Sequence, residues 1–250
     1  MAYRPDPDLE FLAQVSSPDL EGLVSTLTHD KDGEVRFTEE LTQSELYKQY
    51  HPDHNKYWQL VAAELQSFGA NTFATMLRGG KGVLYKEILT DVCDKLKVNY
   101  KKDAAVGVIE QNLMMKILTD AIERMSVEEI RQMAEEAGVA NFGSLSKDAA
   151  IAAFIAVFRA GGFKSYQILV IVVNAVLKAL IGRGLAFGGS AVLTRTASVL
   201  VGPVGWVVTG LWTAFDVASP AYRITIPAVI QVVALRQKLI SDSSSGRIHL

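Results

Sequence analysis

Apolar residues recur at helical spacing through most of the first 140 positions. After Trp58, the side chains of Val61, Leu65 and Phe68 follow three or four positions apart, which places all four on one face of a helix. The same spacing predicts helices in three further segments: residues 9–27, 84–97 and 106–138. None of these segments alternates between apolar and polar residues as a half-buried strand would. The pattern therefore predicts an all-α N-terminal region.

Residues that favour helix ends flank these segments. Ser126 is followed three positions later by Glu129, a pairing in which each side chain can satisfy a free backbone amide of the other residue. Ser146 is a good N-cap, and Gly69 and Gly138 can each end a helix in the left-handed conformation that glycine tolerates. Because the connections are short, neighbouring helices are expected to be antiparallel, as in a multi-helix bundle.

Beyond Ser146 the sequence becomes apolar on all sides. Four runs carry few or no charges: residues 149–158, 168–181, 197–215 and 224–235. Glycines such as the pair Gly161-Gly162 separate or interrupt them. We therefore predict an all-α multi-helix bundle with three parts: an acidic amphipathic helical region over 1–145, an apolar, basic, glycine-rich helical region over 146–240, and a disordered tail over 241–250.

Charge divides the chain in the same way as hydropathy does. The 250 residues carry 25 Lys and Arg against 27 Asp and Glu, a formal net charge of −2. Residues 1–148 hold 16 basic and 25 acidic side chains, whereas residues 149–250 hold 9 basic and 2 acidic ones. A basic, apolar region is attracted to an anionic surface, which a membrane, a nucleic acid or the protein's own acidic half can supply.

The apolar helices admit two interpretations. A helix that is hydrophobic on every side is either buried in a globular bundle or associated with a membrane. The charge-free run of 19 residues that contains Trp206 and Trp212 is long enough to cross a hydrocarbon core of about 30 Å, with the indoles as interfacial anchors. Lys178, Arg183 and Arg195 disfavour permanent spanning, because a cation at the bilayer centre costs about 2.5–3.5 kcal/mol. They suit contact with an anionic bilayer instead.

One glycine-rich segment resembles a phosphate-binding loop only superficially. Arg78 and Lys81 flank a pair of glycines, but a P-loop requires a preceding strand and a Ser or Thr after the lysine. Here Gly82 follows the lysine, and the preceding segment is a predicted helix. We therefore expect a turn between helices, with Arg78 and Lys81 as candidates for a generic anion contact.

Candidate catalytic and metal-binding residues form no convincing set. His51 and His54 stand three residues apart, but zinc needs further ligands, and neither His29 nor Cys93 lies at a suitable spacing. The carboxylates of the first half are too numerous for any one to stand out from solvated helix faces. We therefore predict no metal site, no cofactor and no catalytic residue.

Three isolated features concern structure and location. Asp216 is the only carboxylate between residues 149 and 240, and we predict that it forms a structural ion pair with Arg223 or Arg195 rather than a catalytic group. Cys93 is the only cysteine, and its apolar helical setting indicates a core residue. The N-terminus lacks the basic and apolar segments of a secretory signal, so a cytoplasmic location is expected, peripheral to the inner membrane if the membrane interpretation holds.

Three stretches of the chain form a distinctive set: YRPDPDLEFL over residues 3–12, WQLVAAELQ over residues 58–66, and AYRITIPAVIQ over residues 221–231. The turn Gly202-Pro203-Val204-Gly205 accompanies them. Together they resemble the bacterial YaaW-like family, which is grouped distantly with the ubiquinol–cytochrome c chaperone family. The resemblance implies a helical protein, and the distant grouping implies a chaperone role by analogy alone.

The sequence thus predicts a non-enzymatic protein that associates with anionic membranes through its apolar C-terminal helices and docks on or perturbs the bilayer. The alternative is a soluble chaperone or adaptor that binds an apolar client helix. An exposed apolar groove in a soluble protein would favour the adaptor, whereas convergent polar residues around a pocket would favour an enzyme. Nucleic acid is disfavoured as a partner, and self-association stays open.

Overall fold

The computed structural model describes residues 2–30, 32–69, 82–139, 145–182 and 221–244. The regular secondary structure of these residues is helical, with an isolated β-bridge between His29 and Val35, so the predicted all-α fold is confirmed. The elements follow in this order: η1 (Glu10–Gln14), α1 (Ser17–Thr28), η2 (Leu41–Gln43), α2 (Glu45–Tyr50), η3 (His54–Tyr57), α3 (Trp58–Gly69), α5 (Tyr85–Lys95), α6 (Val106–Arg124), α7 (Val127–Glu136), α8 (Lys147–Ala160), α9 (Gly162–Ile181) and α12 (Tyr222–Ser244).

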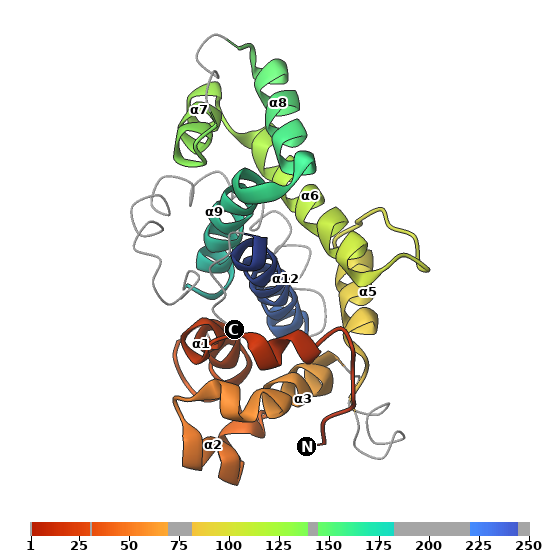
Figure 1. Ribbon diagram of the computed structural model, residues 1–250, viewed down its shortest axis with the longest axis vertical. Coiled ribbons are helices and arrows are strands. Elements are labelled where there is room, and N and C mark those ends of the chain that lie inside the picture. Colours follow the sequence, from red (N-terminus) through yellow and green to blue (C-terminus); the bar gives the residue numbers. More distant parts are fainter. Residues whose placement is uncertain (1, 31, 70–81, 140–144, 183–220, 245–250) are drawn as a thin grey trace.

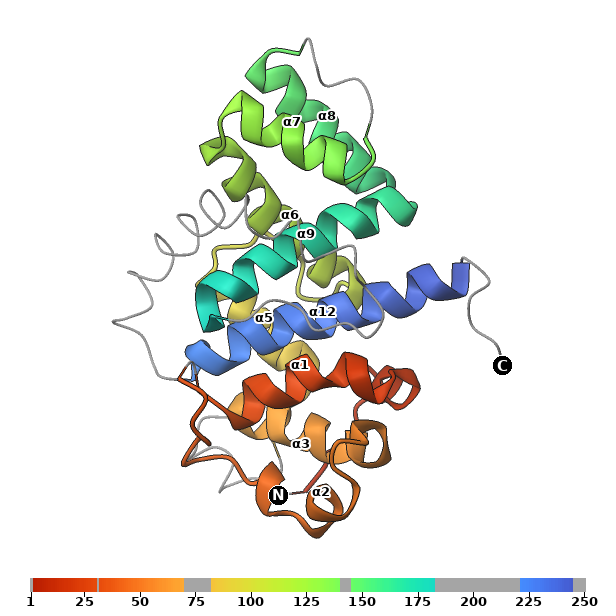
Figure 2. The ribbon, with the colours of Figure 1, turned by 90° about the vertical axis from the view of Figure 1, so that its left-hand side faces the viewer.

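α12 is the central helix of the fold. It packs against α9 and α1, and it also contacts α3 and α5. Figure 1 and Figure 2 both show it running through the middle of the molecule between α9 and α1. Every residue from Ile224 to Leu235 is buried. This apolar run, which is hydrophobic on all sides, therefore forms core.

α9 provides a second apolar layer beside α12. All residues from Ile168 to Leu177 are buried, including Asn174. α9 packs on α12, α8 and α6. The long helix α6 leads from α5 to α7 and α8, which form one end of the molecule (Figure 1). Only one face of α8 is inside, because Ala150, Phe154 and Phe158 are its buried residues.

Most of the predicted helix ends are confirmed. The Ser126 hydroxyl accepts the Glu129 amide at 3.3 Å, and the Glu129 carboxylate accepts the Ser126 amide at 2.7 Å. The Ser146 hydroxyl accepts the amide of Ala149, and Gly138 adopts a φ of +63° after α7. Gly69 was predicted to end α3 in the left-handed conformation, and this is wrong. A Cβ there would lie 2.3 Å from Cγ1 of Ile88, so the glycine instead allows α3 to approach α5 closely.

The sequence predicts a disordered tail over 241–250, and for the first four of these residues the structure shows a helix instead. α12 continues to Ser244, so residues 241–244 are helical, and residues 245–250 lie outside the described part. The hydroxyls of Ser243 and Ser244 donate to backbone carbonyls one turn earlier, each at 2.8 Å. An ion pair between Lys238 and Asp242 at 3.5 Å spans the same turn. The ion pair one turn apart supports the helix, and the serine hydroxyls find backbone acceptors within it.

Two ion pairs join the basic end of α12 to the acidic N-terminal region. Nε of Arg236 lies 3.0 Å from Oε2 of Glu110, whose side chain is fully buried. Nζ of Lys238 lies 2.6 Å from Oδ2 of Asp19, which is also buried. The protein's own acidic half is therefore the anionic partner of these two cations.

Candidate functional site

The chain bends sharply between α8 and α9. The two helices meet at 114°, and Gly161 and Gly162 at the bend have φ values of +72° and +75°. No neighbouring atom lies within 4 Å of a Cβ placed on either residue, so backbone conformation rather than crowding requires glycine there. The Ser165 hydroxyl donates to the Phe158 carbonyl at 2.8 Å and so satisfies a backbone group at the end of α8.

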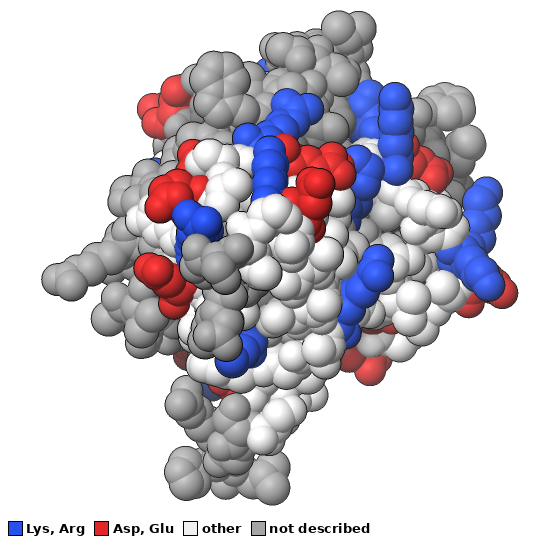
Figure 3. Space-filling view, turned by 90° about the horizontal axis from the view of Figure 1, so that it is seen from above, with Lys and Arg blue, Asp and Glu red and all other residues white. Residues whose placement is uncertain are grey.

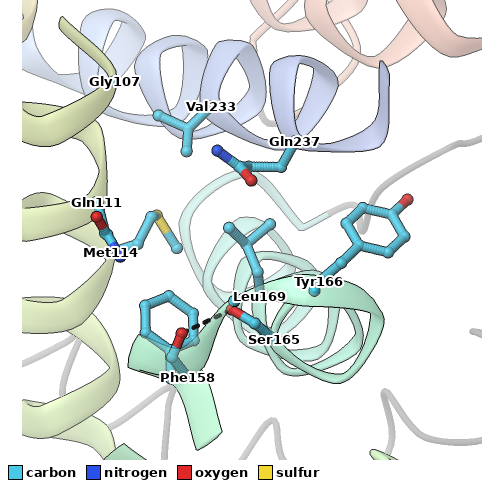
Figure 4. Close-up of a pocket in the computed structure, with 11 residues that line it drawn as sticks. Gly107, Gln111, Met114, Phe158, Ser165, Tyr166, Leu169, Val233 and Gln237 are labelled. Carbon is cyan, nitrogen blue, oxygen red and sulfur yellow. Dashed lines mark hydrogen bonds between the residues drawn. The ribbon is translucent and has the colours of Figure 1, made fainter. Parts of the chain in front are cut away.

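A cavity of about 210 Å³ lies inside this bend (Figure 4), and we call it the elbow cavity. Its wall is built by the first turns of α6, the end of α8, the start of α9 and the second half of α12. The side chains that give it its character are Gln111, Met114, Phe158, Leu169, Val233 and Gln237. The cavity thus exists only because four helices converge on the glycine bend.

The polar groups of the elbow cavity are uncharged. The carboxamides of Gln111 and Gln237 face it from α6 and α12 (Figure 4), and within the described residues neither has a side-chain hydrogen bond. Burial raises the pKa of Tyr166, so its phenol stays neutral. Among the described residues that line the cavity there is no carboxylate, histidine, cysteine, lysine or arginine, and the hydroxyl groups are those of Ser165 and Tyr166.

Three exposed apolar side chains lie close in the sequence to residues that line the elbow cavity. Val108, Phe163 and Ile240 are 49%, 56% and 52% exposed, and each lies within one helical turn of a residue that lines the cavity. Figure 2 shows the bend between α8 and α9 and the C-terminal end of α12 on the same side of the molecule. Apolar residues that cluster on a surface typically mark an interaction site.

The outer face of α8 extends this apolar surface. Ala152 and Ala156 are exposed and Ile155 is half-buried, with Arg159 and Lys164 exposed near the bend. Figure 3 looks onto this end of the molecule and shows basic and acidic side chains interspersed, with uncharged surface between them. The described part of this face therefore carries no broad patch of one sign, which a nucleic acid would require.

The structure describes two of the residues that the sequence predicts to contact a membrane or an anion or to form an ion pair, and neither of them lines the elbow cavity. Lys178 is exposed on the last turn of α9, and Arg223 is exposed on the first turn of α12. The remaining candidates lie outside the described residues: Arg78, Lys81, Arg183, Arg195, Trp206, Trp212 and Asp216. The predicted pair of Asp216 with Arg223 therefore stays a prediction.

His54 is a buried structural residue. Its Nε2 lies 2.5 Å from Oε2 of Glu21, and its Nδ1 lies 2.5 Å from the hydroxyl of Tyr57. These contacts fasten η3 to α1. Among the residues that the structure describes, no group of three or more metal-binding side chains occurs. Cys93 is fully buried, as predicted, and burial raises the pKa of its thiol to about 12.

Sequence reasoning missed the elbow cavity and the buried ion pairs. Gly161-Gly162 was recognised as an interruption, but nothing local indicates which helices converge on it. Glu110 gave an available signal, because a carboxylate that falls on the apolar stripe of a helix needs a buried partner. The partner is Arg236, at the end of an equally apolar run.

α12 is long and apolar enough to cross a membrane by length and composition alone, the one such helix among the described residues. α8 and the first part of α9 reach that threshold only as a bent pair. In the structure, 67% of the apolar window of α12 is buried against the rest of the protein. α12 thus packs as a core helix of the described structure.

The fold and the cavity define an all-helical protein with an uncharged cavity that opens among exposed apolar side chains. The chain belongs to the UPF0174 family, and residues 53–230 match the family described as ubiquinol-cytochrome C chaperone, which confirms the resemblance seen in the sequence. Residues 3–37 match a separate domain of unknown function, DUF3944.

Relatives align along nearly the whole chain. A UPF0174 protein of Helicobacter pylori is 53% identical over 95% of this chain and 94% of its own length. A second UPF0174 protein of Helicobacter pylori is 43% identical over 80% of this chain and 98% of its own. The UPF0174 protein YaaW of Escherichia coli is 34% identical over 94% and 95%. No solved structure matches the chain.

Proposed function

We propose that the protein is a non-enzymatic chaperone or adaptor that holds an apolar segment of a client protein at the elbow cavity. The observation that carries the proposal is an uncharged cavity flanked by the exposed side chains of Val108, Phe163 and Ile240. The match of residues 53–230 to a family described as a chaperone supports a role of this kind. Among the described residues of the lining none is charged, and this supports binding of an apolar segment.

The energetics favour an apolar client. Fully burying a large apolar side chain contributes about 1.5–3 kcal/mol, and the three flanking side chains are each about half exposed before binding. Covering all three would thus contribute on the order of a few kcal/mol, before the costs of association. A client side chain that enters the cavity would add contacts with Met114 and Leu169. Arg159 and Lys164 at the bend would favour a client with an acidic flank.

The test is binding of a fluorescently labelled amphipathic peptide with one apolar face to the full chain and to two variants, Phe163→Ser and Val108→Ser. Each should weaken binding by about threefold to tenfold, because each removes apolar area from the mouth of the cavity. Phe37→Ser is the matched control, since Phe37 is fully exposed on a loop of the N-terminal region. Equal binding by all three variants would contradict the proposal.

Membrane association is the second candidate function. The observation in its favour is the exposed Phe163 beside Arg159 and Lys164, since an apolar side chain next to cations suits an anionic bilayer surface. The charge-free run around Trp206 and Trp212 lies outside the described residues and adds to it. In this case the protein would lie on the cytoplasmic face of the inner membrane; the chaperone role likewise assumes a cytoplasmic location.

Flotation with vesicles separates the two candidates. Recovery with anionic but not neutral vesicles, reduced in the variant Phe163→Ser, is expected if the bend contacts the bilayer. Recovery that is unchanged by this variant would assign the contact to another part of the chain. If the full chain stays soluble and monodisperse with both kinds of vesicle, the membrane role is excluded and the client role stands alone.

A further inference from the structure

A groove of the surface is lined by residues of the N-terminal segment and by the first residues of α3, Trp58 and Gln59. Figure 2 shows the N-terminus and α3 in the part of the molecule opposite α7 and α8. The volume of the groove is about 670 Å³, within the range of about 300–1,000 Å³ typical of ligand sites. Three aromatic side chains line it: Tyr3, Phe11 and Trp58. Two prolines and one carboxylate complete its rim: Pro5, Pro7 and Glu10. We call it the aromatic groove.

The aromatic side chains present both ring surface and a free donor. All three are half-buried, so part of each ring faces solvent. The rings of Tyr3 and Trp58 meet edge to face, with centroids 5.6 Å apart and an interplanar angle of 73°. Within the described residues the indole N–H of Trp58 has no hydrogen-bond acceptor. Trp58 therefore lines the groove with part of its ring exposed and with an indole N–H that no described residue accepts.

The groove is held in shape before any partner binds. The Gln66 carboxamide donates to the Arg4 carbonyl at 2.9 Å and accepts the Arg4 amide at 3.0 Å, which pins the N-terminal segment to α3. The guanidinium of Arg236 lies 4.2 Å from the ring centroid of Phe11. A preformed site lowers the cost of ordering side chains on binding.

We propose that the aromatic groove binds an extended, proline-rich segment of a partner protein that carries a basic residue. Polyproline II segments dock in aromatic-lined grooves because their rings pack on aromatic faces and their backbone carbonyls have no internal hydrogen bonds. One such carbonyl accepts the indole N–H of Trp58. A helical partner satisfies its own carbonyls and would leave that donor unpaired. Among the described residues that line the groove, Glu10 alone is charged, and it selects an Arg or Lys in the peptide.

This inference is independent of the proposed function. The aromatic groove joins residues 3–37, which match their own domain family, to Trp58, whereas the elbow cavity is built by α6, α8, α9 and α12. If binding experiments contradict the proposal for one of these two sites, the proposal for the other site is unaffected.

The experiment uses the full chain labelled with ¹⁵N, in which the indole signal of Trp58 is assigned through the variant Trp58→Phe. The probe is a peptide of about ten residues, mostly proline with one arginine; a glycine–serine peptide with the same arginine is its control. Saturable movement of the Trp58 signal with the proline peptide alone is the expected result. Calorimetry measures the affinity for the proline peptide. Trp58→Phe should weaken this affinity about tenfold, because the substitution keeps an aromatic ring but removes the hydrogen-bond donor.

Glu10→Gln should weaken binding of the arginine-bearing proline peptide about threefold and leave a version without arginine unaffected. Glu45→Gln, on the exposed side of α2, is the matched control and should change neither. A thermal melt of Trp58→Phe shows that the variant remains folded. Equal binding of the glycine–serine peptide, no binding of the proline peptide, or full affinity in both Trp58→Phe and Glu10→Gln would each overturn the proposal.

Discussion

Glu64 shows how the fold changes the chemistry of a single carboxyl group. Its side chain is 1% exposed, and its two carboxylate oxygens accept the Glu40 amide at 3.2 and 3.3 Å. Burial is the main cause that raises its pKa to about 7; the charges of Glu39 and Glu40 also raise the pKa, whereas hydrogen bonds from the backbone of Glu40 and Leu41 lower it. At the scale of the residue, a group that is ordinarily ionised becomes one that titrates near neutral pH.

The stability of the protein should therefore depend on the protonation of Glu64. Between about pH 4.5 and 7 the folded state keeps this proton and the unfolded state does not. The free energy of unfolding should thus fall as the pH rises through this window, by up to about 3 kcal/mol. Urea unfolding at several pH values measures the slope, which Glu64→Gln should flatten and the exposed Glu45→Gln should leave unchanged. If the pH dependence of the free energy of unfolding is the same in Glu64→Gln as in the unsubstituted protein, Glu64 is not the group responsible.

The pair of Arg236 with Glu110 should behave as a buried ion pair does. Arg236→Met leaves the fully buried Glu110 without its cation, so we expect a loss of about 3–5 kcal/mol in the free energy of unfolding. Adding Glu110→Leu should restore part of the lost stability, because it removes the unpaired buried carboxylate. The recovery is incomplete because the Tyr85 hydroxyl, which donates to Glu110 at 2.8 Å, loses its acceptor. Denaturant unfolding of the single and double variants gives the coupling. The exposed Lys48→Met should cost about 0–1 kcal/mol.

At the scale of elements, the bend between α8 and α9 decides where the candidate site lies. Gly161 and Gly162 reverse an apolar stretch that would otherwise continue as one long helix. The bend exposes Phe163 and directs the first turn of α9 toward α6 and α12. Backbone conformation at two glycines therefore creates the elbow cavity.

A Cβ at this bend should be costly. Gly161→Ala forces alanine into a backbone conformation that only glycine adopts easily, with an expected loss of about 1–3 kcal/mol in the free energy of unfolding. Gly107→Ala is the matched control, because Gly107 also lines the cavity but lies in a helix with open space around its Cα. That change should stabilise the protein by about 0.5–1 kcal/mol. Equal effects of the two substitutions in urea titrations would show that the bend tolerates side chains.

At the scale of the whole molecule, the two halves of the chain share one core. α12 from the C-terminal region contacts α1, α3 and α5 from the N-terminal region, and buried ion pairs join its end to Glu110 and Asp19. Hydropathy divides the chain near residue 145, but the packing does not follow that division. Helices of the acidic N-terminal half therefore pack around α12 of the apolar C-terminal half.

A chain that ends at residue 145 should consequently fail to fold as a unit. Removing α12 exposes the faces of α1, α3 and α5 that pack against it, and deprives Glu110 and Asp19 of their cations. We expect aggregation, or a thermal melt followed by circular dichroism that lacks a cooperative transition. A monodisperse fragment with a sharp transition would instead establish residues 1–145 as an independent domain.

The sequence by itself determined the features that depend on neighbours along the chain. Helical spacing located most of the helices. The capping box at Ser126 and the N-cap Ser146 identified the starts of α7 and α8, and Cys93 was correctly placed in the core. These features are local, because a helix and its caps depend on residues within about one turn. The charge division likewise anticipated attraction between the halves.

Only the tertiary structure decided which distant residues meet. An apolar helix looks the same in sequence whether protein or lipid surrounds it, and the buried position of α12 results from the helices that pack against it. The elbow cavity, the aromatic groove and the pairing of Arg236 with Glu110 all join segments far apart in the chain. Their formation depends on packing in three dimensions, which local periodicity does not encode.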